Sequence, residues 1–255
     1  MANDPMQQFE IKKIFDLPAI AGQDISFTNS SLWMVLAALG VVVFFALTAK
    51  GKLIPGRMQS LGEMSHEFIA NMLKDTTGPE AIKFFPYIFA IFFFILFANL
   101  FGMWPYAFTS TSHLAVSAAL ALFTIGLVVV AGVWKNGLKW FKIFAPAGLP
   151  APMYLLIVPI EVISFLSRPV TLAVRLFANM TAGHVMLKIF AIFIAYLMGS
   201  GGWKIFAAIG PIIGTAAIVA LEFLVAGLQA FVFAILTCVY LNDVYHVDHL
   251  SLIHI

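Results

Sequence analysis

The chain has little charge and almost no cysteine. Only 10% of its 255 residues are charged and 62% are hydrophobic, whereas about a quarter of a typical soluble domain is charged. This balance excludes an ordinary soluble protein and predicts an integral membrane protein. A single cysteine, Cys238, excludes an internal disulfide framework. The formal net charge of +2 says little about partners, and no feature of the chain predicts binding to nucleic acid.

Several motifs are also missing. The chain has no glycine-rich phosphate-binding loop, tandem repeat or low-complexity tract, so we expect no nucleotide chemistry and no cofactor. Residues 1–30 mix acids with apolar residues, and therefore lack both the hydrophobic core of a signal peptide and the Arg-rich pattern of a transit peptide. We expect the first long apolar run to be a retained membrane anchor.

Three apolar segments have the length of about 20 residues that a bilayer core requires, namely 31–49, 84–104 and 114–134. Between the first two, residues 57–75 are not uniformly apolar. At helical spacing, their apolar residues fall on one side and their charged residues on the other. This pattern predicts an amphipathic helix on the membrane surface or against a partner. Ser60 to Glu63 has the form of a capping box at its start.

Two further apolar segments, 152–198 and 211–242, are separated by a glycine-rich turn. As single helices they would be about 67 and 48 Å long, against a hydrocarbon thickness of ~30 Å. Either Pro159 and Pro169 break the first segment, or a long helix lies tilted or bent. We predict an all-α membrane protein of one domain, 1–255, with an outer N-terminal segment, 1–30, and a hairpin of two long helices.

Basic residues lie between the first two spans and after the third, and none lies between 105 and 113. Because basic loops stay in the cytoplasm, we expect the N-terminus outside and the C-terminus in the cytoplasm. The residues concerned are Lys50, Lys52, Arg57, Lys74, Lys83, Lys135, Lys139 and Lys142.

One arginine, Arg175, lies inside the first long segment. A cation near mid-membrane costs several kcal/mol, of order 2.5 or more, unless it has a partner or faces water. Guanidinium does not lose its proton at physiological pH. Glu161 and Arg168 precede it at intervals of seven and share its helix face, with Thr171 and Asn179 adjoining. Arg175 therefore either pairs within the chain, with Glu161 or Glu222, or has a function.

On the second long helix, Glu222 and Gln229 are also seven apart. If Arg175 and Gln229 have similar depth, His184 lies about 13.5 Å and Glu222 about 10.5 Å further toward the outside. Glu161 lies about 21 Å from Arg175 on the inner half. Titratable groups on both sides of a permanent cation predict an interrupted proton route, because histidine and glutamate exchange protons and arginine does not.

Other interpretations exist for these residues. Asn99, Asn179 and Gln229 can serve only as hydrogen-bonding groups between helices, and His184 can be a packed core histidine. The tail residues Asp243, His246, Asp248 and His249 resemble a metal cluster superficially, but a solvated tail is favoured, so we predict no metal site. A secondary transporter would show an internal repeat, and a self-contained proton channel would not need a fixed cation.

Four stretches together resemble subunit a of the F-type ATP synthase membrane sector, CF(0), over essentially the whole chain. They are residues 4–11, residues 97–105, the run from Ser167 to Met180 with Gly183-His184, and the run from Glu222 to Leu241. One departure is Gly102, where some relatives carry an acid in the second span.

The resemblance implies a role for each polar residue. Arg175 would be the essential arginine that faces the carboxylate of a rotating ring of c subunits, and the two long helices would be unbroken and tilted along that ring. Glu161 would belong to the cytoplasmic half-channel, and His184 and Glu222 to the outer half-channel. The other polar positions, near the arginine or secondary, would be Asn179, Gln229, Arg168, Thr171 and Asn99.

The resemblance also implies the function of the chain: a proton-translocating stator subunit that couples proton-motive force to ATP synthesis and has no catalytic site of its own. Its implied partners are the c ring, subunit b of the peripheral stalk, other ATP synthase subunits, the lipid bilayer and protons. The expected location is a bacterial inner membrane, with a mitochondrial inner membrane as the alternative.

Overall fold

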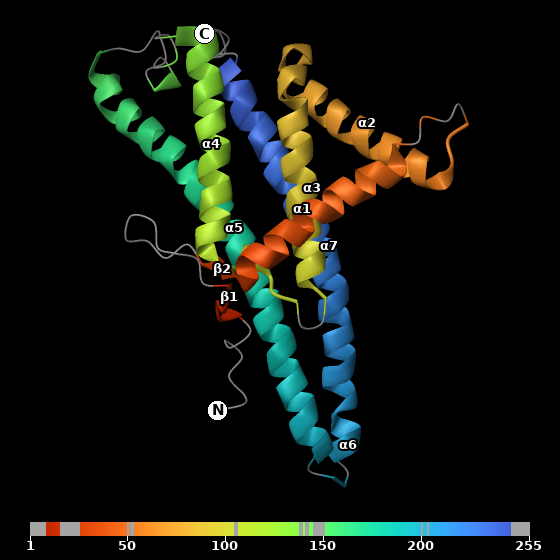
Figure 1. Ribbon diagram of the computed structural model, residues 1–255. Coiled ribbons are helices and arrows are strands. Elements are labelled where there is room, and N and C mark those ends of the chain that lie inside the picture. The colour runs from red at the N-terminus through yellow and green to blue at the C-terminus, as the bar shows by residue number, and fades with distance from the viewer. Residues whose placement is uncertain are drawn as a thin grey trace. The chain divides into compact units, whose positions relative to one another are not determined.

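The computed structural model describes residues 9–15, 26–49, 51, 54–104, 107–137, 140, 143–144, 151–199, 201–202 and 204–245. The helices and strands, in chain order, are β1 (Lys13–Phe15), β2 (Phe27–Thr28), α1 (Asn29–Thr48), α2 (Arg57–Thr77), η2 (Pro79–Phe84), α3 (Phe85–Gly102), η3 (Ser110–Ser112), α4 (Leu114–Asn136), α5 (Ala151–Gly199), α6 (Lys204–Ala207) and α7 (Ile209–Tyr245) (Figure 1). The predicted basic residues Lys50, Lys52, Lys139 and Lys142, and the tail residues His246, Asp248 and His249, lie outside the described residues.

The described chain is mostly helical, as predicted. Five of its helical segments are long and apolar enough to cross a membrane, judged by length and composition: Asn29–Thr48, Pro79–Gly102, Leu114–Asn136, Pro152–Gly199 and Ile205–Val244. The apolar runs expected to span the bilayer fall on α1, α3 and α4, and the two long segments fall on α5 and α7.

Helix α5 continues from Ala151 to Gly199 with Pro159 and Pro169 inside it. Each proline removes one backbone donor from the helix, but membrane helices tolerate this because neighbouring groups satisfy the backbone. After Pro169, the Thr171 hydroxyl donates to the carbonyl oxygen of Ser167 at 2.8 Å. The alternative in which the prolines break the segment into shorter helices is therefore wrong.

Two groups of segments form compact units. The first comprises Met1–Val43, Phe94–Val116 and Arg175–Ala230. Within it, the second part of α5 runs beside the first part of α7 in the opposite direction (Figure 1). The α3 residue Asn99 donates from Nδ2 to the Ala226 carbonyl of α7 at 3.4 Å. At the start of α1, the Asn29 side chain donates to the Glu10 carbonyl and accepts from the Lys12 amide.

The second unit comprises Phe44–Phe93, Ser117–Val174 and Phe231–Ile255. A buried core joins α4 to the end of α7 and to two residues that follow α4: Val128, Val244, Trp140 and Ile143. Polar side chains add hydrogen bonds around it. The Thr77 hydroxyl donates to the Cys238 carbonyl at 2.9 Å, and Asn136 Nδ2 donates to the Val244 carbonyl at 2.7 Å.

Helix α2 differs from the prediction at its start. It begins at Arg57, with Gly56 at the N-cap and no side-chain hydrogen bond there. The predicted capping box is wrong, because Glu63 lies within the helix and accepts a hydrogen bond from Gln59 Nε2 at 2.9 Å. The buried apolar residues of α2 are Ile69, Ala70, Met72 and Leu73, while Met58, Leu61, Met64 and Phe68 are exposed.

Candidate functional site

Arg175 lies on α5 at the start of its segment of the first unit, and its side chain is half-buried. Within the described part of the chain it makes no ion pair. Pairing with Glu161 or Glu222, which the sequence left open, is not found. A permanent cation in an apolar helix thus lacks a counter-charge among the described residues, which favours a partner from outside the chain or water.

One turn after Arg175, α5 is connected to α7 by a side-chain hydrogen bond. Asn179 Nδ2 donates to Gln229 Oε1 at 2.9 Å. Gln229 is only 3% exposed, and its Nε2 has no hydrogen-bond partner in the described parts of the chain. Since residues four apart on a helix are about 6 Å apart along its axis, Gln229 lies about one helical turn from the level of Arg175.

Glu222 is 3% exposed, and neither of its carboxyl oxygens has a hydrogen-bond partner among the described residues. Its side chain lies directly against Gly183, where a Cβ atom would collide with the Glu222 Oε1. Gly183 therefore permits this close approach of α7 to α5. The carboxyl group lies beside the residue that precedes His184, but it forms no direct hydrogen bond with the imidazole.

His184 is hydrogen-bonded elsewhere. Its Nε2 lies 2.9 Å from the Thr109 hydroxyl, and the imidazole tautomer decides which of the two atoms donates. The Thr109 hydroxyl also lies 3.2 Å from the Gly102 carbonyl oxygen, to which it can donate. A Cβ atom on Gly102 would approach Thr109 Oγ1 to 2.8 Å. The Thr109 side chain thus fills the space beside Gly102.

Thr109 belongs to a buried polar segment, residues 109–112, which sequence reasoning missed. All four side chains carry hydroxyl groups, and all four residues are buried. Thr111 Oγ1 donates to Asn99 Oδ1 at 2.9 Å, the Ser110 hydroxyl donates to the Ser30 carbonyl, and the Ser112 carbonyl accepts from Thr181. The available signal was an uninterrupted run of Thr and Ser directly after an apolar span. Asn99 and His184 thus contact two different hydroxyl groups of one buried segment.

The second unit holds the other predicted residues. Glu161 is half-buried, and no hydrogen bond or ion pair is seen between it and another described residue. Thr171 is exposed, with its hydroxyl satisfied by its own helix. Exposed polar residues of α5 in this unit are Ser164, Ser167 and Thr171. A polar helix side facing lipid is unfavourable, which indicates that protein or water covers it in the membrane.

Arg168 has partners in the second unit. Its Nη1 lies 2.9 Å from Asp243 Oδ2 of α7, and its guanidinium lies over the Tyr240 ring, 4.9 Å from the centroid, and 5.6 Å from the Phe165 centroid. Asp243, which the sequence placed in a solvated tail, is thus an ion-pair partner. Within the described ranges, no group of three or more His, Cys, Asp or Glu side chains could hold a metal ion.

Comparison with known proteins agrees with the resemblance seen in the sequence. The family described as ATP synthase A chain matches residues 31–242. The chain is 56% identical over 250 residues to ATP synthase subunit a of Hyphomonas neptunium, covering 97% of this chain and 98% of that protein. It is 53% identical over 248 residues to ATP synthase subunit a of Allorhizobium ampelinum, covering 96% and 98% of the two chains. ATP synthase subunit a of Chelativorans sp. is 52% identical over 251 residues, 98% of this chain and all of that one.

Proposed function

Because the chain belongs to the ATP synthase A chain family, and is thus a proton-translocating stator subunit of the membrane sector, we propose that Arg175 separates two proton half-channels. The counter-charge of Arg175 would be a carboxylate on a rotating ring of c subunits. The observation that carries this proposal is a half-buried arginine with no ion pair among the described residues. An arginine that only stabilised the fold would have its partner in the chain.

In this proposal, protons reach the ring from outside through a route that includes His184 and Glu222. Both are titratable side chains of the first unit. His184 is bonded to the Thr109 hydroxyl, and Glu222 lies against Gly183, the residue before His184. Hydroxyl groups both donate and accept hydrogen bonds, so they can connect proton carriers without holding a charge. The position of Thr109 against Gly102 suggests that this hydroxyl serves where some relatives use an acid.

A ring carboxylate that has accepted a proton is neutral and can enter lipid, which its charged form could do only at high cost. After nearly a full turn it would meet the inner route near Glu161. There the positive charge of Arg175 would favour the ionised form, and the proton would leave. Arg175 cannot relay that proton, because guanidinium stays protonated. The fixed cation therefore prevents protons from passing directly between the two routes.

Each proton that crosses a potential of 100 mV releases about 2.3 kcal/mol. In this mechanism the ring converts that energy to torque, and ATP is made elsewhere in the complex, where nucleotide binds. The partners proposed for the chain are the c ring, subunit b and the other synthase subunits in a bacterial inner membrane. The N-terminus would face outward and the C-terminus the cytoplasm. The exposed polar residues of α5 support a protein partner along this helix.

The decisive test replaces the arginine in the intact complex. Arg175→Ala should abolish proton-driven ATP synthesis, measured in inverted membrane vesicles, while the assembled complex is recovered in normal amount. The loss should exceed roughly a thousandfold, or about 4 kcal/mol, because no other described side chain replaces the fixed charge. Normal proton-driven ATP synthesis by this variant would contradict the proposal.

A further inference from the structure

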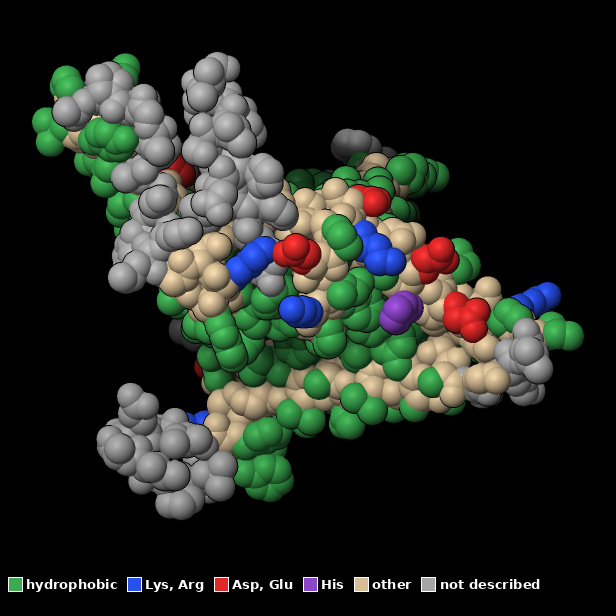
Figure 2. Space-filling model, turned by 90° about the horizontal axis from the view of Figure 1, so that it is seen from above, with side chains coloured by type: hydrophobic (Ala, Val, Ile, Leu, Met, Phe, Trp, Pro, Cys, Tyr) green, Lys and Arg blue, Asp and Glu red, His purple; other side chains and the backbone are tan. Residues whose placement is uncertain are grey.

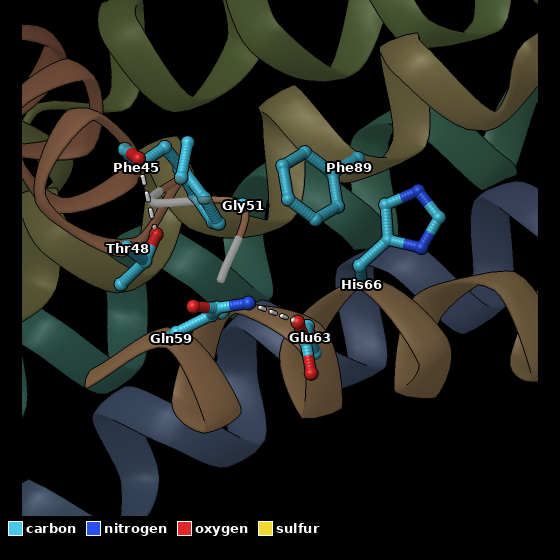
Figure 3. Close-up of a pocket in the computed structure, with 9 residues that line it drawn as sticks. Phe45, Thr48, Gly51, Gln59, Glu63, His66 and Phe89 are labelled. Carbon is cyan, nitrogen blue, oxygen red and sulfur yellow. Dashed lines mark hydrogen bonds between the residues drawn. The ribbon is translucent and has the colours of Figure 1, made fainter. Parts of the chain in front are cut away.

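A cavity of about 530 Å³ lies within the second unit, between the end of α1, the first half of α2 and the start of α3 (Figure 3). This volume lies within the range of about 300–1,000 Å³ that is typical of small-molecule sites. Residues from all three helices line it, with side chains of two chemical kinds. The larger apolar ones are Phe45 of α1 and Phe89 of α3, and the polar ones are Thr48 of α1 and Gln59, Glu63 and His66 of α2.

The cavity lies at the ends of two membrane-crossing helices. Thr48 is the last residue of α1, and Phe89 is in the second turn of α3. Helix ends of this kind lie at the depth of lipid headgroups, with the apolar turns beyond them beside the acyl chains. Helix α2 approaches very closely here, because a Cβ atom on Gly62 would lie 2.7 Å from the Thr48 Cβ. Phe45 and Phe89 give the cavity aromatic sides on α1 and α3, and Gln59, Glu63 and His66 give it a polar side on α2.

Two polar groups point toward this space. Gln59 Nε2 donates a hydrogen bond to Glu63 Oε1 at 2.9 Å, which holds the carboxylate in place at the edge of the cavity (Figure 3). The His66 imidazole packs at a tilt against the Phe85 ring, with ring centroids 4.5 Å apart. The centroid of the Phe89 ring lies 6.1 Å from that of the imidazole. Both Glu63 and His66 are exposed. A carboxylate accepts hydrogen bonds only, and an imidazole always carries at least one N–H donor.

The exposed charges of α2 and η2 have both signs. Figure 2 shows basic, acidic and histidine side chains together on one face of the molecule. The exposed charged and histidine residues of α2 and η2 are Arg57, Glu63, His66, Glu67, Lys74, Asp75, Glu80 and Lys83. A surface of mixed sign matches a zwitterionic headgroup better than one of a single sign, because like charges facing each other repel.

We propose that this cavity binds an aminophospholipid of the phosphatidylethanolamine type. Its primary ammonium donates a charge-assisted hydrogen bond to the Glu63 carboxylate, and its phosphate accepts one from the His66 imidazole. Its acyl chains lie on Phe45 and Phe89. Phosphatidylcholine lacks an N–H donor for Glu63, and phosphatidylglycerol lacks the cation, so both fit less well. This proposal concerns the second unit and does not depend on the role of Arg175.

The test titrates the purified full-length chain in detergent micelles with each of these three phospholipids, and counts bound lipid by native mass spectrometry. We expect phosphatidylethanolamine to bind at least about fivefold more tightly than phosphatidylcholine, because one charge-assisted hydrogen bond separates them. Glu63→Gln should reduce that preference to less than about twofold. Glu67→Gln, on the same helix but outside the lining residues, should retain it.

Two further arms separate the parts of the site. His66→Phe keeps an aromatic ring on Phe85 but removes the donor, so it should weaken the binding of all three lipids. Soluble phosphoethanolamine, which lacks acyl chains, should compete poorly; competition as strong as that of the lipid would contradict the lipid site. Equal binding of the ethanolamine and choline lipids by the wild-type chain would overturn the proposal. So would a preference that persists in a folded Glu63→Gln chain.

Discussion

Two arginines of helix α5, seven residues apart, have opposite surroundings. Arg168 has an ion pair with Asp243 at 2.9 Å and lies over two aromatic rings. Arg175 is half-buried and has no ion pair in the described part of the chain. Sequence spacing alone places both on one helix face. What distinguishes them is whether the fold supplies a counter-charge.

In the proposed mechanism, this difference separates a structural arginine from a functional one. At Arg168 the interactions are complete within the chain, so its charge is neutralised locally and joins α5 to α7 in the second unit. At Arg175 the charge remains available to a group that arrives from outside. A ring carboxylate that comes and goes needs such a charge, because a permanent partner in the chain would compete with it.

After the loss expected for Arg175→Ala, the largest effect should come from giving Arg175 a partner of its own. Asn179→Asp places a carboxylate one helical turn away, where the two side chains can pair. We expect proton-driven ATP synthesis to fall by at least about tenfold, or 1.4 kcal/mol, since the internal pair competes with the ring. Asn179→Ala is the control, because it also removes the donor to Gln229 but adds no charge. Equal activities of the two variants would argue against competition for Arg175.

The same contrast between partnered and unpartnered groups exists in the proposed outer route, where His184 is bonded to Thr109 and Glu222 has no partner among the described residues. Replacing either one with the other, His184→Glu or Glu222→His, should lower ATP synthesis by roughly tenfold, because two groups of one kind then stand in place of an imidazole and a carboxyl group. The double exchange should recover part of that activity, because it keeps one imidazole and one carboxyl group. A double variant as inactive as the singles, or worse, would exclude a shared route.

A smaller effect is expected at the partnered arginine. The Arg168 and Asp243 side chains are 18% and 31% exposed, so their pair is partly protected from water. A double-mutant cycle with Arg168→Gln and Asp243→Asn should give a coupling free energy of about 1 kcal/mol in thermal unfolding. ATP synthesis should stay within roughly twofold of wild type, far less than the loss at Arg175. A large loss of synthesis by stable Arg168→Gln complexes would erase the distinction between the two arginines.

The smallest effect concerns His113, outside the spanning helices, whose ring stacks on Phe108 with centroids 5.0 Å apart. Burial lowers the pKa of His113, and a hydrogen bond with the backbone of Phe9 opposes this only in part. The unfolded segment therefore binds more protons, so local stability is complete above the usual histidine pKa and falls as the pH drops below it. Amide hydrogen exchange in residues 9–15 should be faster at pH 5.5 than at pH 7.5, after correction for intrinsic rates. In His113→Gln the difference should disappear; its persistence would assign the effect to another group.

The sequence predicted most of the helices and the polar residues of α5 and α7, because long apolar runs and charges within them are strong signals. The continuity of α5 through Pro159 and Pro169 did not follow from the residues alone, since a proline can break a helix or be tolerated in it. The capping-box pattern at Ser60 was misleading, because α2 had already begun at Arg57.

Two contacts of the candidate site depend on tertiary packing and could not be derived from spacing. The burial of residues 109–112 follows from hydrogen bonds to residues distant in sequence, such as Asn99 and Thr181. The pairing of Arg168 with Asp243 required the end of α7 to lie against α5, 75 residues earlier in the chain. Periodicity predicts which face a residue occupies, but it does not reveal which residue will meet it.

The most direct measurement is an experimental structure of the assembled ATP synthase with its c ring in the membrane. We predict the Arg175 guanidinium within about 4 Å of a ring carboxylate, or joined to it by one water, and no ion pair between Arg175 and this chain. Arg168 should still be paired with Asp243. An Arg175 that pairs with Glu161 or Glu222 inside the chain and turns away from the ring would contradict the account.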